Sequence, residues 1–383
     1  SPPTPTKPRP SGRSVLWCHA SCFLLVSSFA ILMPFYQARR DAFDCDTVCY
    51  GRYTSLRSFL SLIGSFICGR LSDRFGRISL LYLGVAATLV GLCFSMVAKD
   101  VFGLYLAMIP GALFQNNFSV SKAYFADYAA SVKGGKVKDE EVAGLVGKLG
   151  MSVGVSFMIG PMLGGMLVKT FEGGVVVALV ITFLSGVCVS LIPRVNSSIV
   201  KPKKKTDEDE DEKVAAPFLD LTPLSRPGPR IILLLRVLMA MAFHCFMTPW
   251  TPSLKERFDF GPSQHGTFMS FVGLVYALSQ GFAAKAVIKL VGRNDVILVA
   301  SSVFLSMGRV VAMGTTDLRI VYVCFFFIII SLGVTNTVIS STLNTLAPPD
   351  KIGGLIGLVG SFESLAGMLG PIIGGYVHAR GGK

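Results

Sequence analysis

Long apolar segments recur along this chain, and they limit its fold more than any other feature of the sequence. A hydrocarbon core about 30 Å thick needs roughly 20 apolar residues per helix. Charged residues make up only 15% of the 383 residues, against about a quarter in a soluble domain. The sequence therefore predicts an all-α polytopic membrane protein. Eleven spans are expected, at 14–36, 54–70, 79–98, 101–126, 144–168, 173–192, 230–248, 264–290, 295–313, 318–346 and 352–377.

A charged segment, residues 193–229, divides these spans into six and five. It holds three consecutive lysines, Lys203–Lys205, and then six consecutive acids, Asp207–Glu212. Blocks of like charge repel one another and bury no apolar area, so a disordered cytoplasmic linker is expected. The predicted domains are a flexible cytoplasmic tail (1–13), a six-helix N-terminal half (14–192), the linker (193–229) and a C-terminal half (230–383) of five helices, truncated before a twelfth.

The formal net charge of +13 comes mainly from Lys and Arg in alternate loops. The loops at 69–77, 133–148 and 285–293 would share one side of the membrane. Because cytoplasmic loops are enriched in Lys and Arg, a cytoplasmic N-terminus is expected, in a membrane that the sequence does not specify. Nucleic acid is not an expected partner, since no basic patch is interleaved with aromatic residues.

One short charged stretch, Gly69–Arg77, joins the second and third spans. Glycine near each end lets the backbone turn sharply. Asp73 can make charge-assisted contacts with neighbouring arginines at the membrane surface. The stretch reads Gly-Arg-Leu-Ser-Asp-Arg-Phe-Gly-Arg. It resembles the loop 2–3 signature of the major facilitator superfamily, with matches at Gly69, Leu71, Asp73, Phe75, Gly76 and Arg77.

This resemblance implies a cytoplasmic gate between two six-helix halves. It implies that Asp73 contacts the N-terminal end of the eleventh span, near Ile352–Gly357, where the helix dipole favours a carboxylate. It also implies that Arg77 pairs with Asp127 at the foot of the fourth span. These contacts would hold the cytoplasmic side shut while the other side is open.

The fifth and eleventh spans carry the same pattern of glycine and proline at an offset of 210 residues. A repeat at a fixed offset predicts two related halves, whereas generic small-residue packing is the alternative. Small residues let helices approach closely, and proline removes a backbone hydrogen bond. The two copies are Gly150-x9-Gly160-Pro161-x2-Gly164-Gly165 and Gly360-x9-Gly370-Pro371-x2-Gly374-Gly375.

The fifth span also resembles the helix-packing motif of the drug:proton antiporter branch, although Ser156 replaces its first glycine. The fourth span departs from that branch. Relatives carry Arg-x-x-Gln-Gly there, whereas this chain, aligned on Gly111, has Ala107 and Pro110 at the Arg and Gln positions. The first span holds no acidic residue. The residues that usually couple transport to protons are therefore absent.

Ionisable residues inside a membrane are costly and are candidate functional residues. Glu363, midway along the eleventh span, could carry a proton, or a neighbouring serine or backbone carbonyl could satisfy its carboxyl group. His244, in the seventh span, could titrate near neutral pH or serve as a hydrogen-bonded packing residue. Arg57 and Arg309 could attract an anionic group or extend toward the membrane surface, and extension is favoured. Arg236 is also expected to extend toward the membrane surface.

Three adjacent amides, Gln115, Asn116 and Asn117, lie inside the fourth span. They could line a cavity and bind a solute, or they could bridge helices. Cavity lining is favoured, because three adjacent amides cannot all face one neighbour. Cys45 and Cys49 lie in a polar loop, where they could form a disulfide on an extracellular or lumenal face. Free thiols on a helix start are the alternative.

These features predict a secondary active transporter of small organic solutes, with organic cations or drugs as candidate solutes and proton antiport as candidate coupling. The alternative is a non-transporting membrane receptor or adaptor on the same scaffold. No enzyme is expected, because metal-binding histidine pairs, Gly-x-Ser-x-Gly and phosphate-binding loops are missing. Expected partners are an organic solute, protons and the lipid bilayer; the chain is expected to be a monomer with no cofactor or metal.

Overall fold

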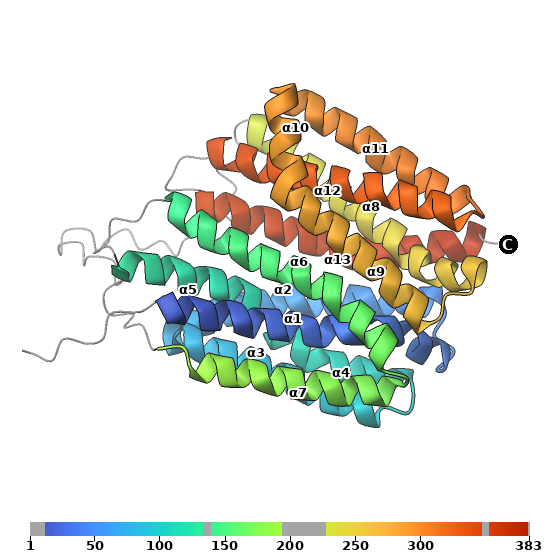
Figure 1. Cartoon of the computed structure of the whole chain (residues 1–383), viewed down its shortest axis with the longest axis horizontal. Helices are drawn as coiled ribbons and strands as arrows, with labels where there is room; N and C mark the ends of the chain where they lie inside the picture. Colours follow the sequence, from blue (N-terminus) through green and yellow to red (C-terminus); the bar gives the residue numbers. More distant parts are fainter. Residues whose placement is uncertain (1–11, 133–138, 194–226, 347–351, 382–383) are drawn as a thin grey trace, which may run out of the picture.

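The computed structural model describes residues 12–132, 139–193, 227–346 and 352–381, except for some side chains that include that of Asp73. Within these ranges the regular elements are helices, and no strand is present (Figure 1). They are α1 (Gly12–Asp41), α2 (Thr47–Phe75), α3 (Arg77–Val97), α4 (Val101–Phe114), α5 (Asn117–Val132), α6 (Asp139–Leu167), α7 (Phe171–Ser190), α8 (Pro227–Phe258), α9 (Pro262–Leu278), the π-turn η4 (Ser279–Ala283), α10 (Ala284–Val291), α11 (Asn294–Gly314), α12 (Leu318–Leu346) and α13 (Ile352–Gly381).

The helices form two groups that meet along two seams (Figure 1). In the first group, α1 packs on α6 and α7, and α3 packs on α4 and α7. In the second group, α8 packs on α13 and α11 packs on α12. Between the groups the main contacts are α6 with α9 and α2 with α13, which we call the α6–α9 seam and the α2–α13 seam.

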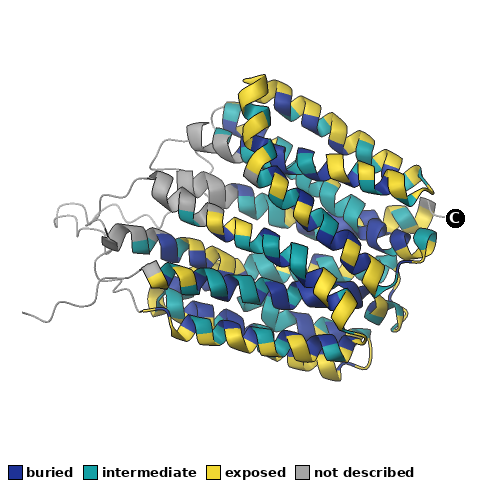
Figure 2. Ribbon diagram, in the orientation of Figure 1, coloured by how far each residue is buried: buried dark blue, intermediate teal, exposed yellow. Residues whose placement is uncertain are grey.

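Many large apolar side chains are exposed on the described helices, as a lipid-facing surface requires. Figure 2 shows exposed residues along the outer helices. Within the described ranges, seven helices are long and apolar enough to cross a membrane by length and composition, from Arg13–Asp41 to Leu318–Ile339. The other expected spans coincide with α2, which carries several arginines, with α13, and with the interrupted helices α4–α5 and α9–α10. The predicted all-α membrane fold is confirmed, with about eleven spans.

The expected span at 101–126 is not one continuous helix. It breaks at Gln115 and Asn116, between α4 and α5, and the amide of Asn116 donates to the carbonyl of Phe114 instead of continuing the helix. The thiol of Cys68 in α2 donates to the carbonyl of Leu113 at 3.6 Å. A neighbouring helix therefore contacts a carbonyl group that lies just before the break.

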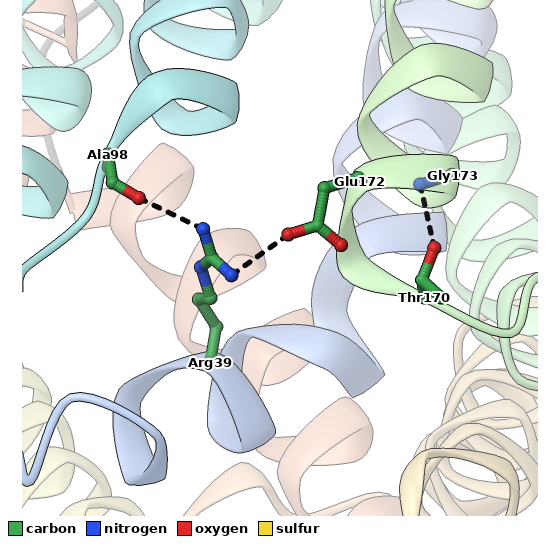
Figure 3. A network of polar contacts seen from close by, with 5 residues as sticks. All are labelled: Arg39, Ala98, Thr170, Glu172 and Gly173. Carbon is green, nitrogen blue, oxygen red and sulfur yellow. Dashed lines mark hydrogen bonds and ion pairs between the residues drawn. The ribbon is translucent and has the colours of Figure 1, made fainter.

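Three helices of the first group are tied together at the end of the bundle that carries the α1–α2 loop. We call this the outer end, after the expected orientation. Arg39 of α1 donates to Glu172 of α7 at 2.9 Å and to the carbonyl of Ala98 after α3 at 2.9 Å (Figure 3). The hydroxyl of Thr170 accepts from the amide of Gly173 at 3.1 Å and caps α7. These bonds hold α1, α3 and α7 in one group.

Cys45 and Cys49 form a disulfide at the outer end, next to the start of α2. Of the two alternatives for this pair, the disulfide is therefore the one present. The other seven cysteines are free thiols. A disulfide is typical of an oxidising compartment and agrees with an outer end that faces away from the cytoplasm.

The expected tail and linker lie outside the described residues, apart from their ends. α1 begins at Gly12, and α8 begins at Pro227 inside the expected linker. α8 also runs to Phe258, well past the expected end of the seventh span. Its last part stands at the outer end, where it meets the first group of helices.

Candidate functional site

A cavity of about 310 Å³ lies between the two groups of helices, where α2 faces α8 and α13. We call it the central cavity. Arg57 lines it from α2, His244 from α8 and Glu363 from α13. Arg57 was expected to extend toward the membrane surface, and this expectation is wrong because its side chain is turned into the bundle. The rest of the lining is Ser58, Ser61, Gly360, Ser364 and Gly367.

Glu363 is held by an arginine of the neighbouring helix. Arg236 Nε donates to Glu363 Oε1, and Arg236 Nη1 donates to Oδ1 of Asn336 in α12. The expectation that Arg236 extends to the membrane surface is wrong, because a carboxylate within reach offers a charge-assisted hydrogen bond. The carboxyl group is therefore satisfied by a guanidinium rather than by a serine or a carbonyl. A proton-carrying role for Glu363 stays a prediction.

His244 packs against α13 and also lines the central cavity. A Cβ atom on Gly370 would lie 2.6 Å from the Cβ atom of His244, so only glycine permits this approach. The imidazole ring stands edge-on to Phe243, with 5.4 Å between ring centroids. The histidine therefore has a packing role, and its titration stays a prediction.

The three adjacent amides of the fourth span separate. Asn117 is buried and its Nδ2 donates to the carbonyl of Leu81 in α3 at 3.0 Å. Asn116 Oδ1 accepts from the hydroxyl of Ser65 in α2 at 3.3 Å. Gln115 lines a second cavity, inside the first group of helices. Two amides therefore bridge helices, and one lines a cavity as expected.

The expected pair at the inner end is present. Arg77 Nε lies 3.0 Å from Asp127 Oδ2, and Arg77 Nη1 donates to the hydroxyl of Ser72 at 2.7 Å. Gly76 joins α2 to α3 with φ of +89°, a backbone conformation that residues other than glycine rarely adopt. The ion pair of Arg77 with Asp127 thus links the α2–α3 turn to α5.

The rest of the gate motif is only partly visible. Leu71 packs against the buried cluster of the first group, and a Cβ atom on Gly69 would meet open space. The side chain of Asp73 and those of 352–358 in α13 lie outside the described part of the chain. The expected latch between Asp73 and the start of α13 therefore stays a prediction.

The repeated glycines of α6 and α13 make equivalent contacts. A Cβ atom on Gly160 would lie 2.6 Å from the Cβ atom of Ala30 in α1, the same distance as between Gly370 and His244 in α8. The next glycines, Gly164 and Gly374, approach backbone carbonyl groups of the same two helices. In each copy, this face packs on the first helix of its own group.

The last glycine of each copy packs across a seam. A Cβ atom on Gly165 would lie 3.0 Å from the carbonyl oxygen of Pro262 in α9. One on Gly375 would lie 3.0 Å from the carbonyl oxygen of Thr47 in α2. The contacts agree with two halves related by the repeat, with α2 equivalent to α9.

Sequence reasoning also missed the two seam glycines that face the repeated prolines. A Cβ atom on Gly51 of α2 would lie 2.5 Å from the carbonyl oxygen of Pro371, and one on Gly266 of α9 would clash with the carbonyl oxygen of Pro161. Each glycine lies near the start of the second helix of its group. A search there for small residues opposite the repeated prolines could have found them.

The two groups also meet through polar contacts at the outer end. The contacts join α1 to α8 and α2 to α13, so the outer end is closed in this structure. They are Gln37 Nε2 with the carbonyl of Thr251 at 3.0 Å, Lys255 Nζ with Asp41 Oδ2 at 2.7 Å, and Arg52 Nη2 with the hydroxyl of Tyr376 at 3.1 Å.

A cavity between two repeat-related helix groups is typical of secondary transporters. The sequence profile of the Major Facilitator Superfamily matches residues 15–371. The chain belongs to the Major Facilitator Superfamily. Solute carrier family 22 member 18 of Mus musculus is 25% identical over 347 residues, which cover 87% of this chain and 81% of that protein. Tetracycline resistance protein, class D, of Salmonella ordonez is 23% identical over 338 residues, covering 86% and 80%.

Solved structures of major facilitator proteins share the fold. A bacterial homolog to the human lysosomal transporter Spinster, in an inward-facing and unoccupied conformation, aligns with a TM-score of 0.74 and 16% identity over 98% of this chain and 84% of that one. The human organic anion transporter MFSD10 (TETRAN) aligns with a TM-score of 0.67 and 18% identity, covering 97% and 94%. The expected resemblance to this superfamily is confirmed, and the chain is an integral, multi-pass membrane protein of a transporter family.

Proposed function

We propose that this chain is a secondary active transporter that carries small organic solutes by alternating access. The observation that carries the proposal is the central cavity, to which Arg57 comes from one half and Glu363 from the other. The outer end is closed, and an inward-facing structure is among those with the same fold. Rotation of the two halves about this cavity would expose it to each side in turn.

The names of the relatives support drug-like solutes. They include tetracycline resistance proteins and multidrug resistance protein 2 of Bacillus subtilis. Organic cations were expected from the sequence. In the central cavity, however, Glu363 is already paired with Arg236, and Arg57 has no acidic partner among the described residues. The cavity lining therefore favours neutral or anionic solutes over cations.

Proton coupling would act through Glu363. Protonation would remove the negative member of its pair with Arg236 and release a guanidinium beside the central cavity. A gradient of pH could then change the charge of the cavity between the two orientations. Antiport with protons follows if, in a given orientation of the transporter, binding of the solute and binding of the proton exclude each other.

The test is uptake of radiolabelled tetracycline by proteoliposomes with an imposed pH gradient. The variant Glu363→Gln should abolish gradient-driven uptake while leaving solute exchange intact. Glu172→Gln is the matched control, because its carboxylate pairs with Arg39 at the outer surface. Unchanged driven uptake in Glu363→Gln would refute the coupling, and a wild-type chain that moves none of a panel of organic solutes would refute transport.

A receptor or adaptor on this scaffold is the second candidate. Ala107 and Pro110 stand where drug:proton antiporters are expected to carry Arg and Gln, and this departure favours a chain that has lost coupled transport. Capture of a specific partner by residues 193–229, without solute flux in proteoliposomes, would distinguish this function from transport.

A further inference from the structure

A second cavity, of about 180 Å³, lies inside the first group of helices and is lined mainly by α1, α2, α3 and α4. Tyr36, Tyr50 and Tyr53 line it, and we call it the tyrosine pocket. Two residues of the other half, Thr251 of α8 and His265 of α9, complete its wall at the outer end. It is therefore separate from the central cavity, although the two share Arg57.

Two arginines face the tyrosine pocket without a counter-ion. The guanidinium of Arg40, whose residue is 9% exposed, lies 3.7 Å from the ring centroid of Tyr50. That of Arg57 lies 5.1 Å from the ring centroid of Phe29. Both arginines line the pocket together with Tyr53. No Asp or Glu is among the described residues that line the pocket, and neither arginine makes an ion pair with any described residue.

A buried histidine adds an unsatisfied polar atom to the same pocket. His265 is 3% exposed, and its Nδ1 atom has no hydrogen-bond partner. A buried polar atom without a partner is costly, and in a native protein it calls for an explanation. Since the imidazole nitrogen can donate a hydrogen bond in one tautomer, an acceptor group in the pocket would satisfy it.

The size and chemistry of the pocket limit what can enter it. An apolar cavity of about 150 Å³ holds a benzene molecule, so a cavity of about 180 Å³ suits one aromatic ring with a small substituent. Aromatic walls suit the ring. Arginine binds carboxylates through its planar, forked donors. We propose that the tyrosine pocket binds a small aromatic carboxylate, with its ring against the tyrosines and its carboxylate facing Arg40 and Arg57.

Binding there would depend on the arrangement of the two halves. Because Thr251 and His265 belong to the second half, the pocket is complete only while the outer end is closed. A ligand that binds one arrangement better than another shifts the population toward it. The carboxylate would therefore stabilise the outward-closed arrangement. This inference goes beyond transport and does not need it.

The test is binding of benzoate to the purified full chain in detergent, measured by isothermal titration calorimetry. Benzylamine is the matched probe with the same ring and the opposite charge. We expect saturable binding of benzoate and none of benzylamine. Arg40→Gln should weaken benzoate binding about tenfold or more, because it removes a charge-assisted contact, whereas Arg40→Lys should keep part of the affinity. Arg309→Gln, on α11 over the ring of Phe246, should bind benzoate as the wild type does.

The inference is overturned if the folded wild-type chain binds no benzoate, if benzylamine binds equally well, or if Arg40→Gln keeps full affinity. Size-exclusion chromatography and the melting temperature without ligand report whether Arg40→Gln is folded. If it is not, Arg57→Gln gives the same comparison. Binding is measured without a gradient, so a failure of transport in proteoliposomes leaves this result unaffected.

Discussion

Glu363 on α13 accepts a hydrogen bond from Arg236 on α8, and the pair stands beside the cavity between the two halves. The same guanidinium donates to Asn336 on α12. Three helices of the second half therefore meet at one side chain. Both members of the ion pair are half-buried, so each depends on the other for its charge balance.

Arg236→Gln should lower the free energy of unfolding by about 1–2 kcal/mol, because it leaves the carboxylate of Glu363 without its charged donor. The double variant Arg236→Gln/Glu363→Gln should lose less than the sum of the single losses. Chemical unfolding in detergent, analysed as a double-mutant cycle, measures this coupling. Additive losses in the cycle would show that the two side chains do not interact.

Gly266→Ala should destabilise the chain and reduce solute uptake, because the new Cβ atom would clash with the carbonyl oxygen of Pro161 across the α6–α9 seam. Gly150→Ala is the matched control on α6, since its Cβ atom would meet nothing within 4 Å. The control should be neutral or more stable by up to about 1 kcal/mol, the helix propensity of alanine over glycine. Melting temperatures in detergent compare the two, and equal values would argue against close seam packing.

Asp73→Asn should lower solute uptake without reducing the amount of chain inserted in the membrane, because the gate motif is expected to need a carboxylate opposite the start of α13. Asp295→Asn is the matched control, since this exposed acid pairs locally with Arg293. Uptake per inserted molecule is the measurement. Normal uptake in Asp73→Asn would mean that Gly69–Arg77 serves only as a topological anchor.

The denatured chain should expose seven reactive thiols before reduction and all nine cysteines after it, because Cys45 and Cys49 are joined. Alkylation followed by mass spectrometry counts them. Cys45→Ser should add one thiol to the unreduced count rather than remove one. Nine thiols without reductant would mean that the outer end faces a reducing compartment.

The parts of the fold that depend on local composition were predictable from the sequence. The length of each apolar run gave the spans, and the 210-residue offset indicated the equivalence of α6 and α13. The contact between Arg77 and Asp127 was implied by the resemblance to the superfamily's loop 2–3 signature. The spans and the repeat can be found within the sequence itself, and the Arg77–Asp127 contact can be inferred from a family resemblance.

Contacts between distant helices were not predictable in the same way. Arg236 and Glu363 are 127 residues apart, and no periodicity indicates that their helices adjoin at the same depth. The directions of Asn116 and Asn117 depend on a helix break that an apolar run conceals. The first span was expected to end at residue 36, whereas α1 continues to Asp41 and brings Arg40 into the tyrosine pocket.

The backbone contacts at Gly51 and Gly266 bear on how the molecule can move. Rigid carbonyl groups meet bare glycines there, so at these two points no side chain separates the helices of the α2–α13 seam or of the α6–α9 seam. Translation of one half along the other would separate or overlap backbone atoms at both places. A hinge-like rotation that treats the two seams alike avoids this. The softest collective motion of the chain is therefore expected to be a rocking of one half against the other that preserves the symmetry between the two seams.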